Sequence, residues 1–421
     1  MAEPPRGEDA PAPKTRPPTR PKPRDVRLDV LRGAALATIF LTHVPGNLFE
    51  GYTLREWGFS DAAEGFVLMA GVSAGLAYGP AFRPGGDALG GTMRVWGRAW
   101  TLYLVHLLVT TAAFGIAAGL ALWADAPGLL HLNGIDALLL RPVETMVAVP
   151  LLLHQLAYAN ILPLYAAFLL LAPAALWLGQ RRPGLLLAGS LLLWAAAGTW
   201  RLNLPSWPVP GGWPFSPFSW QAPFVVGLLV GLRMREGRRL VPLRADLLAL
   251  AGTLLLVALL WRTVPAFGGA MNGLLARLAA EGAPWVLVSF HKTWDTAPRF
   301  LHALALAYVL SVPLLSRVCE GRWAEPFALL GRHALPVFGL GSILAFLLQG
   351  VRTETGADPR LDGALLLGGI LLQLALARAR DGLRARSGRG GAASDARKGS
   401  GIGGTASPAR TGDPQIHNLV L

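Results

Sequence analysis

The sequence predicts an all-α fold, a polytopic bundle of about ten membrane-spanning helices with both termini in the cytoplasm. Hydrophobic residues make up 53% of the 421 residues, and charged residues make up only 15%. Apolar runs of roughly 18 or more residues, the length that a helix needs to cross a bilayer, recur along the chain. A soluble domain has no means of burying so many runs of this length.

Ten apolar segments are expected to span the membrane, and no internal repeat relates them. The loops after the second, fourth, sixth and eighth segments are rich in Arg and Lys, whereas the other loops are poor in these residues or balanced by acidic ones. This alternation follows the positive-inside rule, so an even number of spans with both termini cytoplasmic is self-consistent. The expected spans are residues 28–48, 60–82, 92–122, 158–178, 184–200, 217–234, 245–263, 298–317, 333–351 and 363–381.

A basic tail at 1–26 and another at 383–421 flank the membrane domain, residues 27–382. Both tails are rich in Pro, Gly, Ser or Ala, and we predict that they are disordered. The net charge of +13 lies largely in them, and we interpret it as a topology signal facing lipid headgroups rather than as a nucleic-acid site. Residues 1–26 also lack the apolar core of a secretory signal. The single cysteine, Cys319, excludes an intramolecular disulfide and argues against a metal site built on thiolates.

Two expected outer loops have unusual content. Residues 200–217 contain Trp200, Trp207 and Trp213, which suit either an aromatic belt at the membrane surface or a platform on which sugar rings stack. Both interpretations stay open. Residues 264–297 form a second long loop, and a loop of that length more often has a function than a purely connecting role.

Ionisable residues inside spans are costly and usually face an interior cavity. We expect these residues to form two sets. The set on the cytoplasmic side is mostly cationic, which suits a phosphate-bearing donor. In the set on the outer side, histidines lie beside carboxylates, which suits removal of a proton from a hydroxyl. Simple snorkelling at the interface is the alternative for the arginines. The cytoplasmic set contains Asp29, Arg32, Arg94, Arg98, Arg332 and His333; the outer set contains His43, Asp61, Glu64, Gln221, Arg299 and His302. Trp220 opens the same span as Gln221, and His106 lies near the face of Arg98.

Arg32 and His43 stand at the two ends of the apolar stretch RGAALATIFLTH. A separation of eleven residues turns a helix by about 1100°, so the two side chains share one face, ~16 Å apart along the axis. They cannot hydrogen-bond to each other, but they can line one cavity or contact two ends of one long ligand. Asp29 lies three residues before Arg32 and can pair with it.

The spacing from Arg32 to His43 matches an R-x10-H signature. The stretches that follow in order include GFSDAAEGFVLMAGVSAGLAYG, SPFSWQAPFVVGLLVG, APRFLHALALAYVL and LGRHALPVFGLGSILAF. Together these blocks resemble the OpgC branch of the membrane acyltransferase-3 superfamily over roughly residues 24 to 380. The resemblance implies about ten helices in the bacterial inner membrane. It also implies transfer of an acyl group, succinyl in this branch, from cytoplasmic acyl-CoA to a hydroxyl of a periplasmic glucan.

The residues and the resemblance together give one hypothesis about the site. The resemblance makes His43 the general base or acyl-handling residue and Arg32 its signature partner, and we expect Glu64 or Asp61 to support the histidine. Where many superfamily members have Ser-Gly, this chain has Ala70-Gly71. No metal is expected, and acyl-CoA is the co-substrate. The expected donor-binding residues are Arg32, Asp29, Arg94 and Arg98, and those of the acceptor or cavity are His106, Trp220, Gln221, Arg299 and His302.

Two other classes of function use the same features. A transporter or channel for a solute or a glycan would use the intramembrane polar groups as its path. A binding or scaffolding protein would be insensitive to changes at His43 and Arg32. The string GLLVG at 227–231 is at most a helix-packing motif.

Overall fold

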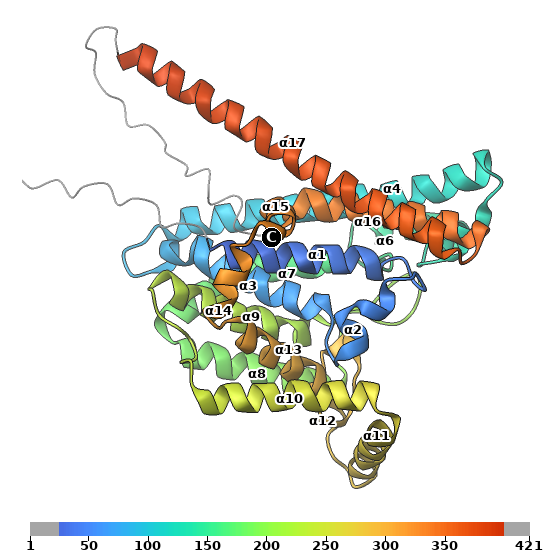
Figure 1. Cartoon of the computed structure of the whole chain (residues 1–421), viewed down its shortest axis with the longest axis horizontal. Coiled ribbons are helices and arrows are strands. Elements are labelled where there is room, and N and C mark those ends of the chain that lie inside the picture. Colours follow the sequence, from blue (N-terminus) through green and yellow to red (C-terminus); the bar gives the residue numbers. More distant parts are fainter. Residues whose placement is uncertain (1–24, 400–421) are drawn as a thin grey trace, which may run out of the picture.

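The chain folds into a bundle of helices, most of which run along one direction (Figure 1). The computed structural model describes residues 25–399, with side chains for residues 25–384. Within this part of the chain the regular secondary structure is helical, and the one β-bridge joins Pro205 to Gly212. The predicted all-α class is therefore confirmed.

Each of the ten predicted spans overlaps a helix, although the boundaries differ and the first helix ends at Thr42, six residues before the predicted end of the first span. These helices are α1 (Val26–Thr42), α3 (Ala62–Tyr78), α4 (Ala88–Trp123), α7 (Ile161–Arg181), α8 (Pro183–Trp200), α9 (Pro217–Arg235), α10 (Ala245–Thr263), α13 (Ala297–Leu310), α16 (Ala334–Thr355) and α17 (Pro359–Gly399). Shorter helices connect them: α2 (Leu54–Trp57), α5 (Asp136–Leu140), α6 (Pro142–Ala148), α11 (Pro265–Ala280), α12 (Trp285–Val288), α14 (Leu314–Cys319) and α15 (Glu325–Arg332).

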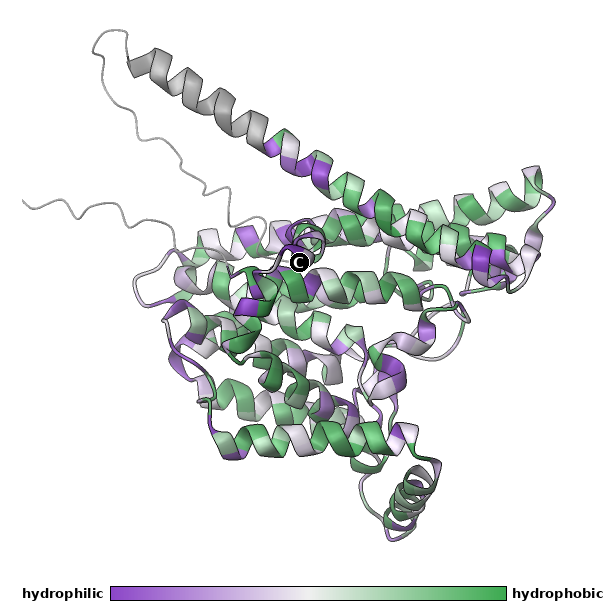
Figure 2. Ribbon diagram, in the orientation of Figure 1, coloured by the Kyte–Doolittle hydropathy of each residue, from purple (hydrophilic) through white to green (hydrophobic). Residues whose placement is uncertain are grey.

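Seven helices in the described residues are long and apolar enough to cross a membrane: α3 with the turn that follows it, α4, α7, α8, α10, α16 and α17. The other three are shorter or more polar, since α1 has 17 residues, α13 has 14, and α9 has Gln221 and Pro223 near its start. Apolar colour covers the middles of the helices, whereas polar residues gather at their ends and in the connections (Figure 2). This pattern is that of a multi-pass membrane protein, while ten crossings and cytoplasmic termini stay predictions.

The predicted span at 298–317 is interrupted in the structure. Helix α13 ends at Leu310, and α14 begins at Leu314, directly after Pro313. Proline has no backbone N–H and its ring clashes with the preceding helical turn, which ends α13 before the expected boundary. At the C-terminus, the backbone of α17 continues to Gly399, past residue 382 where we predicted the tail to begin. The rest of that tail and residues 1–24 lie outside the described residues.

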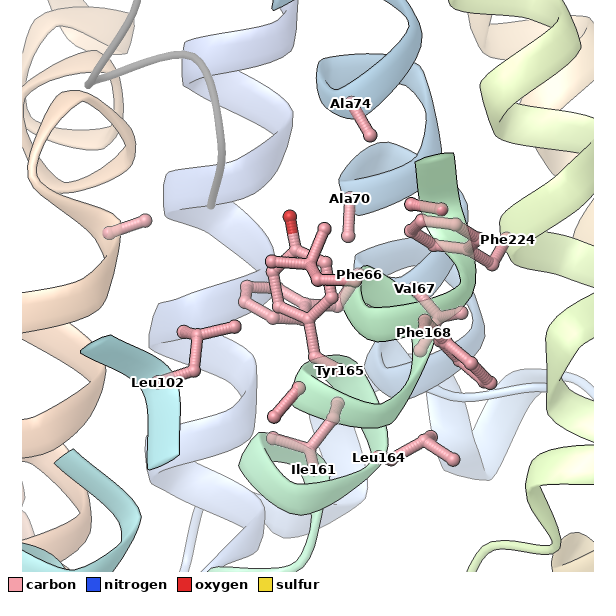
Figure 3. Close-up of a cluster of buried hydrophobic side chains, with 14 of the residues drawn as sticks. Phe66, Val67, Ala70, Ala74, Leu102, Ile161, Leu164, Tyr165, Phe168 and Phe224 are labelled. Carbon is pink, nitrogen blue, oxygen red and sulfur yellow. The ribbon is translucent and has the colours of Figure 1, made fainter. Parts of the chain in front are cut away.

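The largest apolar core lies where α3, α4, α7 and α9 meet (Figure 3). The ring of Phe224 on α9 packs between Phe168 and Tyr165 on α7, with ring centroids 5.1 and 6.2 Å apart. Leu102 on α4 is fully buried in the same cluster. Lipid tails are as apolar as these side chains, so close van der Waals packing, rather than escape from water, holds such helices together.

Glycines bring α3 and α9 into direct backbone contact. A Cβ added at Gly71 would lie 2.0 Å from the carbonyl oxygen of Phe224, and one added at Gly227 would lie 2.0 Å from that of Leu68. Gly231 makes the same kind of approach to Val72, at 2.2 Å. The GLLVG string is thus a packing motif, as predicted, and Gly71 of the Ala70-Gly71 pair is its counterpart on α3.

The substitution Gly71→Ala is expected to destabilise the bundle by about 1–3 kcal/mol, because the new Cβ would overlap the backbone of α9. Gly65 lies on the same helix with no atom within 4 Å of an added Cβ, so Gly65→Ala is expected to be neutral or slightly stabilising. Thermal unfolding of both variants in detergent checks this contrast in sign. A Gly71→Ala protein that unfolds at or above the wild-type temperature contradicts it.

Candidate functional site

A cluster of charged side chains lies at one end of the bundle, around the N-terminus of α3. Asp61 caps α3 by accepting from the N–H of Ala63 at 2.8 Å, and Glu64 reaches back to the N–H of Asp61 at 2.9 Å. Lys292, from the second long loop, binds Asp61 at 2.5 Å. Arg299 on α13 pairs with the fully buried Glu64 and lies 3.4 Å from Asp61. Arg299 therefore joins the two predicted carboxylates, Asp61 and Glu64, and Lys292, which the sequence did not single out, adds a second cation at Asp61.

Asp295 is a further member of this cluster that the sequence analysis missed. It is fully buried, and neither of its carboxylate oxygens has a hydrogen-bond partner among the described residues. Its backbone is left-handed, with φ of 41°, and its carbonyl accepts from the indole of Trp194 at 2.8 Å. Burial, reinforced by the negative charge of Glu64, raises the pKa of Asp295 well above that of an ordinary carboxyl.

The charges in the cluster explain why Asp295 keeps its proton. Asp61, Glu64 and Asp295 supply three carboxyl groups, whereas Lys292 and Arg299 supply two cations. A buried carboxylate without a partner is far more costly than a neutral carboxylic acid, so the carboxyl left without a cation is the protonated one. The sequence offered one signal for Asp295, its position four residues before Arg299 in a long polar loop.

His302 lies beside the cluster and binds Ser60. The hydroxyl of Ser60 is 2.7 Å from Nδ1 of His302, and the backbone N–H of Ser60 points at the same nitrogen at 3.4 Å. Because a backbone N–H can only donate, Nδ1 accepts and Nε2 carries the proton of a neutral ring. Ser60 and His302 are both buried, and this contact ties α13 to the segment that leads into α3.

His43 ends α1 and is partly exposed. Its ring packs against Tyr158, with centroids 4.7 Å apart, and its backbone carbonyl accepts from the side-chain amide of Gln349. Asp61 and Lys292 are near enough to act on it electrostatically. No hydrogen bond joins the His43 ring to Asp61 or Glu64 in the described part of the chain. Packing therefore orients the ring, and the charged cluster is its neighbour rather than its direct partner.

The expected donor-binding residues lie toward the opposite end and divide into two pairs. Arg32 is 1% exposed and donates to the hydroxyl of Ser73 on α3, with Asp29 at 3.5 Å as predicted. This pair is buried between helices. Arg94 and Arg98 lie on successive turns of α4; Arg94 is half-exposed and lies 3.8 Å from Asp87. Nε of Arg98 is buried and has no hydrogen-bond partner within the described part of the chain. The second pair is the one within reach of a ligand.

A cavity of about 240 Å³ that the sequence analysis did not anticipate lies near the same end. Arg181, Arg233 and Glu236 line it, at the ends of α7 and α9. Arg181 also donates to the carbonyl of Phe82 at 3.2 Å, which places the cavity beside the turn that leads into α4. At the same end, His333 pairs with Asp381 on α17 at 2.6 Å. Several cationic side chains therefore lie at this end of the bundle, and its cytoplasmic location stays a prediction.

The remaining predicted site residues have supporting positions. Trp220 is fully buried, and its indole donates to the carbonyl of Lys292 at 2.9 Å, which holds the lysine over Asp61. Gln221 exchanges hydrogen bonds with Ser190 and joins α8 to α9. His106 is fully buried in α4. Of the three tryptophans at 200–217, Trp213 is 5% exposed and suits neither a belt nor a sugar platform, whereas Trp200 is 70% exposed.

Replacing Asp295 by Asn is expected to change how stability depends on pH. The folded protein keeps a proton on Asp295 that the unfolded chain releases, so wild-type stability falls as pH rises above the ordinary carboxyl pKa of about 4. Asparagine cannot ionise and tolerates the left-handed backbone. We expect the variant to match the wild type near about pH 5 and to unfold at a higher temperature near about pH 8.

Asp125 supplies the matched control, since it has a left-handed φ of 51° but is exposed. Asp125→Asn is expected to leave the pH profile of thermal unfolding unchanged. Parallel profiles for the wild type and Asp295→Asn across this range would show that Asp295 is ionised in the folded protein, against the expectation.

Comparison with known proteins places the chain in a family. No curated protein and no solved structure matches it. A family model described as OpgC protein matches residues 24–385, which includes all the helices that carry the charged groups described above. Membership indicates an acyltransferase-type activity. The chain belongs to the OpgC family.

Proposed function

We propose that this protein is a membrane-embedded O-acyltransferase of the bacterial inner membrane. The acyl group, succinyl in this proposal, moves from cytoplasmic acyl-CoA to a hydroxyl of a periplasmic glucan. The observation that carries the proposal is the position of His43, a partly exposed imidazole that ends α1 and lines a narrow cavity between α1, α16 and α17. Family membership supports the class of reaction.

The two ends of the bundle suit the two substrates. Arg94 and Arg98 on α4, with Arg181 and Arg233 around the larger cavity, supply cations for the phosphates of the donor. Helix α1 runs unbroken from Val26 to Thr42, so the separation of ~16 Å between the levels of Arg32 and His43 holds. That length suits an extended pantetheine arm, which carries a thioester from the donor end toward the histidine.

The chemistry assigned to His43 is general base catalysis. The neutral imidazole accepts the proton of the glucan hydroxyl as the oxygen attacks the thioester carbonyl, and it returns the proton to the departing thiolate. Asp61 places a negative charge near the ring that favours the imidazolium, whereas burial and the charge of Lys292 act more strongly in the opposite direction and favour the neutral imidazole that a base needs. A role for Asp61 and Glu64 is thus electrostatic in this proposal, and they need no direct bond to His43.

The proposal is tested by following the acyl group. Purified protein in lipid vesicles, given labelled succinyl-CoA and periplasmic glucan, is expected to transfer label to the glucan as an alkali-labile ester. Mass spectrometry of glucan from cells with and without the protein reports donor and acceptor together. Glucan or solute flux without ester formation is the result that favours the transporter and overturns the acyltransferase.

His43→Ala is expected to lower acyl transfer by about 10²-fold or more, because the hydroxyl loses its base. His131 is an exposed histidine in the described residues and supplies the control, since His131→Ala leaves the base in place and is expected to transfer at the wild-type rate. The test compares the initial rates of ester formation by the two variants. Equal rates for His43→Ala and His131→Ala would show that His43 is not the base.

A further inference from the structure

A small cavity beside His43 contains polar groups that the proposed function has not yet used. It measures about 10 Å³, which is room for one water-sized group. Its wall is mostly apolar and includes Leu36 and Phe40 of α1. Besides His43, the polar side chains on it are Ser342 of α16 and Gln373 of α17.

Ser342 has an unused hydroxyl. The residue is 3% exposed, and its Oγ has no hydrogen-bond partner in the described part of the protein. A serine or threonine in a helix often donates its hydroxyl to the backbone carbonyl four residues earlier. The hydroxyl of Ser73 donates to the carbonyl of Met69 at 2.9 Å, and that of Thr353 on α16 donates to the carbonyl of Gln349 at 2.8 Å. Because a buried hydroxyl without a partner is costly, the position of this hydroxyl on the wall of a cavity points to a polar group that enters the cavity.

Gln373 places an amide on the same cavity. It is 2% exposed, and its Nε2 donates to the carbonyl of Gly369 at 3.2 Å. An amide nitrogen has two N–H groups, so one remains beyond this bond. A Cβ at Gly341 would lie 3.0 Å from Oε1 of Gln373, and one at Gly369 would lie 2.4 Å from the ring of Phe40. Two glycines thus let α16 and α1 close around the amide and hold it in place.

We propose that Ser342 and Gln373 form an oxyanion hole for acyl transfer at His43. This inference rests on the proposed function, because it assigns two donors to the reaction that His43 serves. Each donor is neutral, buried and held on a helix, so little reorganisation is needed when charge develops. The volume of the cavity suits a single oxygen atom rather than a whole substrate.

Acyl transfer begins when the glucan hydroxyl oxygen forms a bond to the thioester carbonyl carbon and its proton goes to His43. The electron pair of the C=O bond moves to the carbonyl oxygen, which becomes the oxyanion between Ser342 and Gln373. Collapse re-forms C=O, breaks the C–S bond and expels the thiolate, which takes the proton from His43. The products are the ester and free coenzyme A, and no other reactant is needed.

Ser342→Ala is the central test, with rates measured on labelled succinyl-CoA and periplasmic glucan. We expect kcat to fall by about 10²–10³-fold while KM for the donor changes little, because the hydroxyl acts on charge that exists only in the transition state. Ser342→Thr keeps the hydroxyl and is expected to recover most of the rate. Gln373→Leu is expected to lower kcat in the same way.

Ser219 on α9 supplies the matched control. It is fully buried, and its Oγ likewise has no hydrogen-bond partner among the described residues, but it does not line this cavity. Ser219→Ala is expected to retain the wild-type kcat. If loss of a buried serine hydroxyl acts only through packing, Ser219→Ala and Ser342→Ala will lose thermal stability and rate in parallel, and that result overturns the oxyanion hole.

The outcomes separate this inference from the proposed function. Full activity in Ser342→Ala beside an inactive His43→Ala overturns the oxyanion hole and leaves the acyltransferase intact. Absence of ester formation by the wild-type protein overturns the proposed function itself. A selective loss of kcat in Ser342→Ala, with recovery in Ser342→Thr and an unchanged Ser219→Ala, supports both.

Discussion

The arrangement of this protein depends on one constraint, that a charge inside an apolar bundle must find its partner within the protein. Water and counterions do not solvate a charge in such a bundle, so burying an isolated charge would cost a prohibitive amount of free energy. Arg32 accordingly lies between Asp29 and Ser73, and Glu64 pairs with Arg299. The contacts of Arg32 with Ser73 and of Glu64 with Arg299 also join two helices each, so satisfying these charges fixes how the helices sit against one another.

Close packing between helices supplies the rigidity that the charges need. Gly71 and Gly227 let α3 and α9 touch through their backbones, and this places the N-terminus of α3 with its two carboxylates. Gly341 lets α16 approach Gln373 of α17, and Gly369 lets α17 approach Phe40 of α1. The glycines therefore position both parts of the candidate site, the charged cluster and the cavity beside His43.

The two parts of the site differ in how they treat polar groups. In the charged cluster nearly every group has an opposite partner, and Asp295 is the member left over, so it holds a proton. In the cavity, by contrast, Ser342 is a neutral donor that has no partner among the residues whose side chains the structure describes. Paired charges give a fixed electrostatic surrounding, whereas an unpaired donor is free to bind something new. This division suits a reaction in which the protein both orients charge and stabilises charge that appears transiently.

The sequence by itself determined the helical class, the positions of the apolar segments, the OpgC resemblance and the spacing that puts Arg32 and His43 on one face. These features follow from local periodicity, which a single helix expresses without its neighbours. Only the tertiary structure decided which charges meet. Lys292 and Asp295 lie at the short 3-10 turn before α13, outside the predicted spans, and Ser342 and Gln373 look like ordinary polar residues in two separate spans. Their roles arise because distant segments pack together, and no spacing along one helix records such contacts between helices.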